Sequence, residues 1–233
     1  MVNAQIWLDQ NYPHEIRKEV KKIDAKDENL EGKLVLQDFP NLEKFECRNN
    51  KGITTIELTN LPKLNHFHAN NCQLTDIKID NCPNINFFNV ANNLLTETNF
   101  LDGLNPEKLT TLSLHTNNFP RQDLKFLSKF SNLKELFLDN CDEEKFENGI
   151  YNKFSGSLEP LQNLTKLELL SIGNTNLSEG LEFLPESFRK IGLNTSWWEV
   201  DTSCSKLRQE LEETSRVEGV TEKLKQHEEG DPA

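Results

Sequence analysis

The amino-acid sequence predicts an α/β solenoid, in which short repeats each add one strand to a parallel sheet on the concave face of a horseshoe arc. Residues 85–95 read Ile-Asn-Phe-Phe-Asn-Val-Ala-Asn-Asn-Leu-Leu, which follows the pattern L-x-x-L-x-L-x-x-N-x-L of a strand and an asparagine-closed turn. Variants of this pattern recur along the chain. Hydrophobic residues make up only 35% of the sequence, which suits an architecture whose repeats each contribute a thin slice of core.

The recurrence gives the predicted strands one by one. The repeats begin at seven apolar residues: Leu42, Leu64, Ile85, Leu109, Leu133, Leu167 and Phe188. Each predicted strand has two inward-facing apolar residues, at the third and fifth positions after its origin. These pairs are Phe45/Cys47, Phe67/Ala69, Phe88/Val90, Leu112/Leu114, Leu136/Leu138, Leu170/Ile172 and Ile191/Leu193.

Each strand is followed by a turn whose buried backbone groups need a short polar side chain as a hydrogen-bond partner. We assign this slot to Asn50, Cys72, Asn93, Asn117, Cys141, Thr175 and Ser196. The slot cysteines and the inward Cys47 are then structural. The five cysteines are an odd number without C-x-x-C spacing, and the first nine residues lack the apolar core of a signal peptide. We therefore expect reduced thiols and a cytoplasmic location.

Residues 1–29 carry no repeat and are predicted to form an N-terminal helical cap. Ile16, Val20 and Ile23 are spaced by four and three residues in a charged background, which is typical of an amphipathic helix. We expect Trp7 to pack against the first repeat, because the first slice of a solenoid must be covered. A partner-binding helix is the alternative.

The segments between the strands change in character along the chain. In the early repeats, over 53–61 and 74–82, apolar residues alternate as in extended structure. Later, Leu124, Leu127 and Phe130 fit a short helix, so the convex side is expected to be mixed extended and helical. An acidic loop at 142–148 interrupts the longest gap. Trp197 and Trp198 are expected to cover the last repeat, and residues 199–233 to form a helical tail that is partly disordered.

With the repeats laid out, residues 30–198 resemble leucine-rich repeat proteins with about seven repeats. Asn152-Lys-Phe-Ser-Gly-Ser-Leu-Glu-Pro-Leu161 is similar to the connector of plant-type repeats. Ile6-Trp-Leu-Asp, Leu30-Glu-Gly and Gly180-Leu-Glu-Phe-Leu-Pro185 are similar to blocks of intracellular fungal members, whose repeats can be joined to a kinase domain. The resemblance implies protein binding and signalling. The motifs of a kinase are missing, so no kinase activity is implied.

The net charge and the placement of the histidines argue against several classes of function. The formal net charge of −12 argues against binding to nucleic acid or to an anionic membrane. His66 and His68 alternate on one predicted strand and His115 lies two repeats further along, which falls short of the converging ligands of a metal site. The repeat pattern pairs none of the five histidines with a nucleophile, so it gives no support for a hydrolase. We therefore expect a protein that is not an enzyme and has no cofactor.

The predicted function is a monomeric, non-catalytic protein-binding module that uses its concave face. Position matching places His68 in one column with Glu46, Asn89, Ser113 and Phe137. Phe87 and Phe137 are aromatic residues at positions that should face water, as interface anchors do. The expected partner-binding residues are Glu46, Arg48, His66, His68, Phe87, Asn89, Ser113, His115, Glu135, Phe137 and Asp139.

One alternative is a regulatory scaffold that engages a signalling enzyme, such as a protein kinase, through the 142–148 loop or the 205–229 helix. Another is a fragment of a larger multidomain protein.

Overall fold

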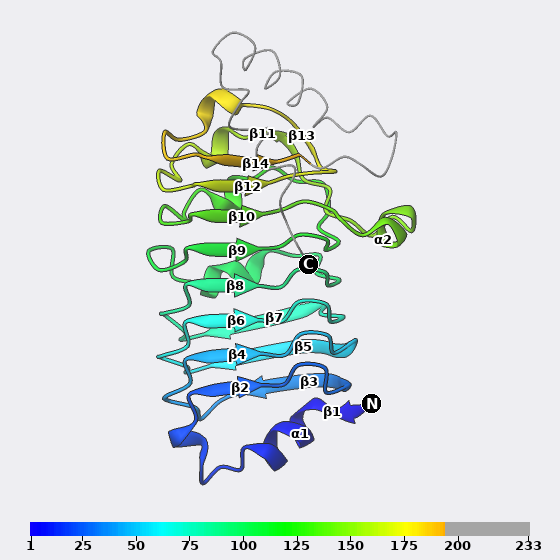
Figure 1. Ribbon diagram of the computed structural model, residues 1–233, viewed down its shortest axis with the longest axis vertical. Helices are drawn as coiled ribbons and strands as arrows, with labels where there is room; N and C mark the ends of the chain where they lie inside the picture. The colour runs from blue at the N-terminus through cyan, green and yellow to red at the C-terminus, as the bar shows by residue number, and fades with distance from the viewer. Residues whose placement is uncertain (194–233) are drawn as a thin grey trace.

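The computed structural model describes residues 1–193 and shows a stack of short parallel strands along the long axis of the molecule (Figure 1). Eight of them form one sheet, in the order β14-β12-β10-β9-β8-β6-β4-β2. Their bounds are β2 Lys22–Asp24, β4 Lys44–Glu46, β6 His66–His68, β8 Phe87–Asn89, β9 Thr111–Ser113, β10 Glu135–Phe137, β12 Leu169–Ser171 and β14 Lys190–Gly192. The seven strands of this sheet that follow β2 in the chain, from β4 to β14, are the seven that the repeat pattern predicts.

A second parallel sheet, ordered β1-β3-β5-β7, lines the other side of the core in the N-terminal half. Its strands are β1 Val2–Asn3, β3 Leu30–Leu36, β5 Gly52–Thr59 and β7 Asp76–Asp80. Side chains of the two sheets, such as Ile56 of β5 and Phe45 of β4, are fully buried in one core. The extended connectors expected in the early repeats are confirmed.

Beyond β7, short 3-10 helices take the place of these strands. They are η2 Asn99–Gly103, η3 Lys125–Leu127, η4 Glu159–Leu161 and η5 Leu181–Phe183, with a two-stranded sheet of β11 Ser155–Ser157 and β13 Asn176–Glu179. The apolar residues Leu124, Leu127 and Phe130 are spaced by three, which matches the three residues per turn of a 3-10 helix. The N–H groups of Leu127 and Phe130 accordingly donate to the carbonyl three residues earlier, so the expected short helix is a 3-10 helix.

The N-terminal segment differs from the prediction. The helix is α1, Ala4–Asn11, whose first turn is capped by the side chain of Asn3 accepting from the Ile6 N–H at 3.0 Å. The prediction of an amphipathic helix through Ile16, Val20 and Ile23 is wrong. Ile16 is 45% exposed, and residues 17–24 form the 3-10 turn η1, Arg17–Glu19, and then β2. Ile23 is buried because it pairs with Phe45 across the sheet, so the sheet begins inside the segment assigned to the cap.

Trp7 of α1 is partly buried against the core, as predicted, with its ring edge-on to Tyr12 at 6.0 Å. The predicted inward pairs of the strands from β4 to β12 are also buried. Phe45, Phe67 and Phe88 stack through successive repeats at 5.6 and 4.9 Å between ring centroids. Within residues 1–193, no helix is long and apolar enough to cross a membrane.

The polar slot in the turns is confirmed where asparagine fills it. Asn93 Nδ2 donates to the carbonyls of Ala69 and Val90, both at 2.9 Å, and so joins one repeat to the next. Asn50 and Asn117 make equivalent bonds, and the Cys72 thiol lies 3.4 Å from the Cys47 carbonyl.

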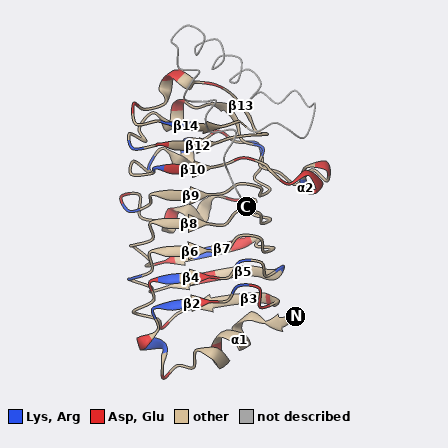
Figure 2. Ribbon diagram, viewed as in Figure 1, with Lys and Arg blue, Asp and Glu red and all other residues tan. Residues whose placement is uncertain are grey.

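The slot assignment of Cys141 is wrong, because Asn152 occupies that position. Asn152 Nδ2 donates to the carbonyls of Leu114 at 2.9 Å and Leu138 at 3.2 Å, and Asn152 is fully buried. Cys141 is exposed. The intervening residues project as a loop that carries the short helix α2, Glu143–Glu147 (Figure 1), and the ribbon of this helix is largely red for acidic residues in Figure 2. The other assignments at Ser196, Trp197, Trp198 and the 199–233 tail lie outside the described residues.

Candidate functional site: the outward face of the eight-stranded sheet

The parallel register places the predicted partner-binding residues in columns on the outward face of the eight-stranded sheet. The first column follows the start of each strand: Lys44, His66, Phe87, Thr111, Glu135 and Leu169. The second follows its end: Glu46, His68, Asn89, Ser113, Phe137 and Ser171. Position matching in the sequence therefore predicted the second column correctly. Arg48, His115 and Asp139 lie two residues beyond their strands.

Two of the predicted residues are less accessible than expected. Glu46 is 5% exposed and Ser113 is 3% exposed, although both belong to the column on the outward face. Ser113 lies between the larger Asn89 and Phe137 in its column. Glu46 is covered by its ion-pair partners. Of the other predicted residues, Glu135 is exposed, and Arg48, His66, His68, Phe87, Asn89, His115, Phe137 and Asp139 are half-buried.

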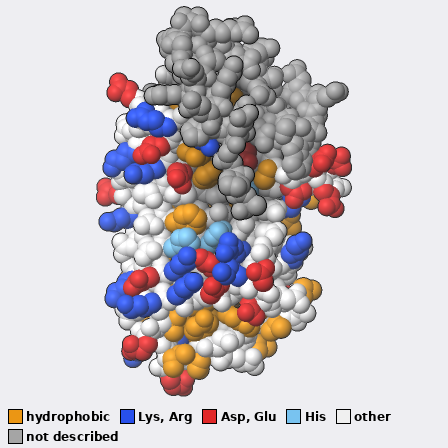
Figure 3. All heavy atoms as spheres, in the orientation of Figure 1, with side chains coloured by type: hydrophobic (Ala, Val, Ile, Leu, Met, Phe, Trp, Pro, Cys, Tyr) orange, Lys and Arg blue, Asp and Glu red, His pale blue; other side chains and the backbone are white. Residues whose placement is uncertain are grey.

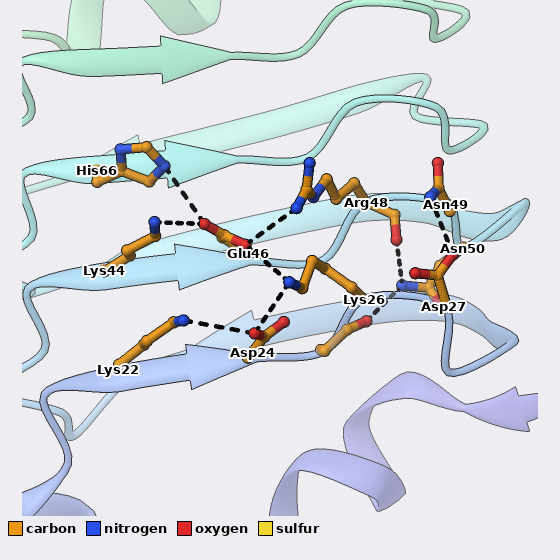
Figure 4. A network of polar contacts seen from close by, with 11 residues as sticks. Lys22, Asp24, Lys26, Asp27, Lys44, Glu46, Arg48, Asn49, Asn50 and His66 are labelled. Atoms are coloured by element: carbon orange, nitrogen blue, oxygen red, sulfur yellow. Dashed lines mark hydrogen bonds and ion pairs between the residues drawn. The ribbon is translucent and has the colours of Figure 1, made fainter. Parts of the chain in front are cut away.

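Glu46 is the centre of a network of charged side chains from three strands (Figure 4). Its carboxylate lies 2.5 Å from Lys44 Nζ and 3.6 Å from Lys26 Nζ. The guanidinium of Arg48 is 3.8 Å away, and His66 Nε2 is 3.7 Å away. Burial alone would raise the pKa of Glu46, but Lys44, Arg48 and Lys26 outweigh it and lower the pKa. Glu46 is therefore ionised and holds these cations in place.

Around Glu46 there are more cations than carboxylates. Asp24 lies 3.4 Å from Lys22 and 3.2 Å from Lys26, and thus joins the same network. Four cationic side chains face two carboxylates, and we call these six residues the basic cluster: Lys22, Lys26, Lys44, Arg48, Asp24 and Glu46. Its surplus of positive charge contrasts with the net charge of −12 for the whole chain. Figure 3 shows blue side chains gathered beside the pale-blue histidines on this face.

Three aromatic rings border the basic cluster. The His66 ring lies parallel to Phe87 at 4.2 Å between centroids with an interplanar angle of 6°, and His68 meets Phe87 edge-on at 5.7 Å. We call these three residues the aromatic stack. Burial and the positive charge of Lys44 lower the pKa of His66. Burial, Arg48 and His66 lower the pKa of His68 to about 4. At neutral pH both histidines are therefore uncharged, and the stack is an aromatic surface beside a cationic one.

The rest of the face is more polar. Glu135 Oε2 accepts a hydrogen bond from Thr111 Oγ1 at 3.2 Å. Phe137 is half-buried on β10, and the strand β9 separates it from Phe87 and the aromatic stack. The two predicted aromatic anchors thus lie on one face but in different columns.

The face also holds two groups of side chains whose potential metal-ligand atoms converge. In each group the ligand atoms lie within 4.8 Å of one another: Glu46, His66 and His68 form one group, and His115, Asp139 and Cys141 form the other. The sequence interpretation considered the histidines without these neighbours. Cys141 was missed because it was placed in the turn slot. A regularity in the sequence could have found the slot residue, since Asn93, Asn117 and Asn152 each precede an apolar residue by two positions, whereas Cys141 precedes Glu143.

Comparison with known proteins supports the repeat architecture. No protein-family model matches this chain. Over 198 residues, or 80% of the chain, the sequence is 30% identical to human Toll-like receptor 8, a leucine-rich repeat protein. The chain spans 17% of the length of that relative. The similarity and the parallel sheet together support leucine-rich repeats, and suggest a protein-interaction module.

Proposed function

We propose that this protein is a non-catalytic interaction module, and that it binds a partner protein on the outward face of the eight-stranded sheet, which we expect to be concave. The observation that carries the proposal is the aromatic stack beside the basic cluster. Half-buried aromatic rings among charged groups are typical of binding hot spots. Similarity to a leucine-rich repeat protein points in the same direction.

The site is suited to binding because its side chains are already ordered. His66 and Phe87 are held by contact with each other, and the cations around Glu46 are held by ion pairs. Binding of a partner therefore costs little conformational entropy at these side chains, because they are held in place before the partner binds. The surplus positive charge favours a partner with an acidic segment, because complementary charge speeds association and selects between partners.

A protein partner fits this charge pattern better than a nucleic acid does. Nucleic-acid binding requires many cations that are free to contact phosphates. Here Lys22, Lys26, Lys44 and Arg48 already face carboxylates of the same cluster, and the chain as a whole is acidic. We propose a protein that acts as a monomer in the cytoplasm. A regulatory scaffold remains the alternative, supported by the projecting acidic helix α2.

The test is partner capture with a pair of charge-matched variants. Phe87→Glu combined with Phe137→Glu places two carboxylates on the proposed face. The control, Thr54→Glu combined with Gln73→Glu, places two carboxylates at exposed positions of β5 and the turn before β7. Proteins that co-purify with the wild type and the control should be lost with the first variant, provided that its circular dichroism is unchanged. Equal capture by all three forms would contradict the proposal.

A further inference from the structure

His115, Asp139 and Cys141 bring an imidazole, a carboxylate and a thiol together at the edge of the outward face. Their potential ligand atoms all lie within 4.8 Å of one another, and Cys141 Sγ is 3.6 Å from His115 Nδ1. We call these three residues the thiol cluster. It lies beyond the ends of β9 and β10, away from the basic cluster on β2 and β4.

The fold positions each member of the thiol cluster. His115 and Asp139 occupy equivalent positions after β9 and β10, and the next N–H group, of Thr116, donates to the Asp139 carbonyl at 2.8 Å. Cys141 is at the surface because Asn152 takes the turn slot, so that the loop 141–151 is extruded with the cysteine at its start. Because of this insertion, Cys141 is not buried in the turn, and its thiol is exposed beside the imidazole of His115.

We propose that His115, Asp139 and Cys141 bind a zinc ion through Nδ1, a carboxylate oxygen and Sγ. Zinc is bound in proteins by these three donor types at about 2.0–2.3 Å in tetrahedral geometry. Those bond lengths place a zinc-bound sulfur and nitrogen about 3.6 Å apart, which is the separation of Cys141 Sγ and His115 Nδ1. Thiolate and carboxylate together balance the charge of the ion, the thiol proton passes to water, and a fourth position remains for water.

Thr116 is placed to support the bound thiolate. Its hydroxyl oxygen lies 3.2 Å from both His115 Nδ1 and Cys141 Sγ, and it accepts the Cys141 N–H at 3.1 Å. When Nδ1 binds the metal, the Thr116 O–H is free to donate to the sulfur. Hydrogen bonds of this kind to metal ligands typically change affinity by about 10- to 100-fold.

The backbone at Thr116 is an independent indication that this position is specialised. Its φ of 54° is in the left-handed region, where a β-branched residue is strained. Every other non-glycine residue with positive φ among residues 1–193 is an asparagine or an aspartate. At the equivalent turn positions, Asn49, Asn71 and Asn92 form a ladder of side-chain hydrogen bonds that starts at Asp27. At the next equivalent position Thr116 replaces asparagine, and its hydroxyl contacts His115 and Cys141 of the thiol cluster instead.

A lysine of the loop 141–151 anchors this loop beside the thiol cluster. Where the ladder ends, Lys145 Nζ from α2 donates to Asn92 Oδ1 at 2.6 Å and to the Asn93 carbonyl at 3.1 Å. The loop that carries Cys141 is therefore fixed to the preceding repeats. A pre-ordered ligand strengthens metal binding because less conformational freedom is lost.

The other convergent group, Glu46 with His66 and His68, is a weaker candidate. Glu46 is already surrounded by Lys44, Lys26 and Arg48 within 3.8 Å, and their charges would repel a metal cation. The thiol cluster has Lys145 nearby, but Asp142 adds a second carboxylate to that of its own member Asp139.

A thiol nucleophile is a further alternative for Cys141. Nucleophilic cysteines have a lowered pKa. Here partial burial of the sulfur, together with Asp139 and Asp142, raises the pKa of Cys141, although the Thr116 hydrogen bond lowers it. A divalent cation bound by Cys141 would instead stabilise its thiolate form.

The test uses the full chain, freed of metal and titrated with zinc against a chromophoric chelator, and separately with cobalt(II). We expect one equivalent of zinc, and a near-ultraviolet thiolate-to-cobalt absorption band. Cys141→Ser, His115→Gln and Asp139→Asn should each weaken binding by more than about 10-fold. The control His14→Gln, at an exposed histidine outside the sheet, should bind as the wild type does.

His68→Gln separates the two convergent groups. Zinc binding that is lost with His68→Gln and kept with Cys141→Ser would overturn the proposal. Binding no tighter in the wild type than in Cys141→Ser would also overturn it. Cys141 is exposed, so Cys141→Ser should fold normally, which circular dichroism would verify. Failure of partner capture leaves these metal measurements unaffected, because they need no partner.

Discussion

Single residues at the turns decide where this solenoid departs from its own repeat. In most turns asparagine occupies the left-handed position, the buried slot or both, since its side chain tolerates positive φ and bonds nearby backbone groups. Thr116 departs from this pattern, because it holds a left-handed position without an asparagine side chain. Cys141 is exposed because Asn152 fills the buried slot. Both residues lie at the thiol cluster, where the proposed zinc site accounts for the backbone strain and for the exposed thiol.

Thr116→Asn should make the protein more stable and a poorer metal binder. Asparagine relieves the strain at positive φ, and we expect the free energy of unfolding to rise by about 1 kcal/mol. Zinc affinity should fall, because the hydroxyl is removed. Urea denaturation and the chelator titration measure the two effects.

Thr116→Val is the matched control for this substitution. It removes the hydroxyl but keeps the β-branch, so it should weaken zinc binding without any gain in stability. A stability gain with valine, or none with asparagine, would contradict the strain argument.

His68 should make stability depend on pH. Its pKa falls from the usual value near 6.5 to about 4, through burial and the charges of Arg48 and His66, while Glu46 acts in the opposite sense. Between these two pH values the unfolded chain binds a proton that the folded protein does not. The stability that neutral His68 contributes is therefore fully present above about pH 6.5 and is lost as the pH falls toward 4. Because His68 is only half-buried and solvent screens its charge, we expect this loss to be on the order of 2 kcal/mol.

The comparison with His68→Gln isolates this effect from the carboxylates that also titrate in acid. The wild type should lose about 2 kcal/mol more stability than the variant between pH 7 and pH 4. Denaturant unfolding at the two pH values measures this difference, and parallel losses in the two proteins would show that His68 contributes nothing.

At the scale of elements, the sequence predicted the strands well and the connections less well. An inward pair such as Phe88 and Val90 repeats at nearly constant spacing, so its strand is readable from one sequence. The first strand of the eight-stranded sheet, β2, was missed because Val20 stands where the repeat pattern has leucine before the inward residue Ile23. The helical spacing of Ile16, Val20 and Ile23 was misleading, since three apolar residues can fit a helix by chance.

The longest insertion gives a direct test of the slot. Asn152→Ala removes hydrogen bonds to the carbonyls of Leu114 and Leu138 and leaves buried backbone groups without partners. We expect a loss of about 3 kcal/mol in the free energy of unfolding. Cys141→Ala, the change at the position first assigned to the slot, should stay within about 0.5 kcal/mol in metal-free buffer. Thermal or urea unfolding would distinguish the two, and a larger loss for Cys141→Ala would restore the original assignment.

At the scale of the whole molecule, the face could be predicted but its clusters could not. Matching repeat positions gave the second column, from Glu46 to Phe137, because parallel strands in register bring equivalent residues together. The stacking of His66 on Phe87 and the burial of Glu46 depend on side chains from neighbouring repeats. Lys26, which helps to neutralise Glu46, follows the strand that the sequence did not reveal.

The central claim is that the outward face of the eight-stranded sheet contacts a protein partner through the aromatic stack. Photo-cross-linking in cells tests it most directly, with benzoylphenylalanine placed at Phe87 in one variant and at Lys78, exposed on β7 of the other sheet, in the control. The proposal predicts a defined cross-linked protein from position 87 and none from position 78. Cross-links from position 78 alone would contradict it.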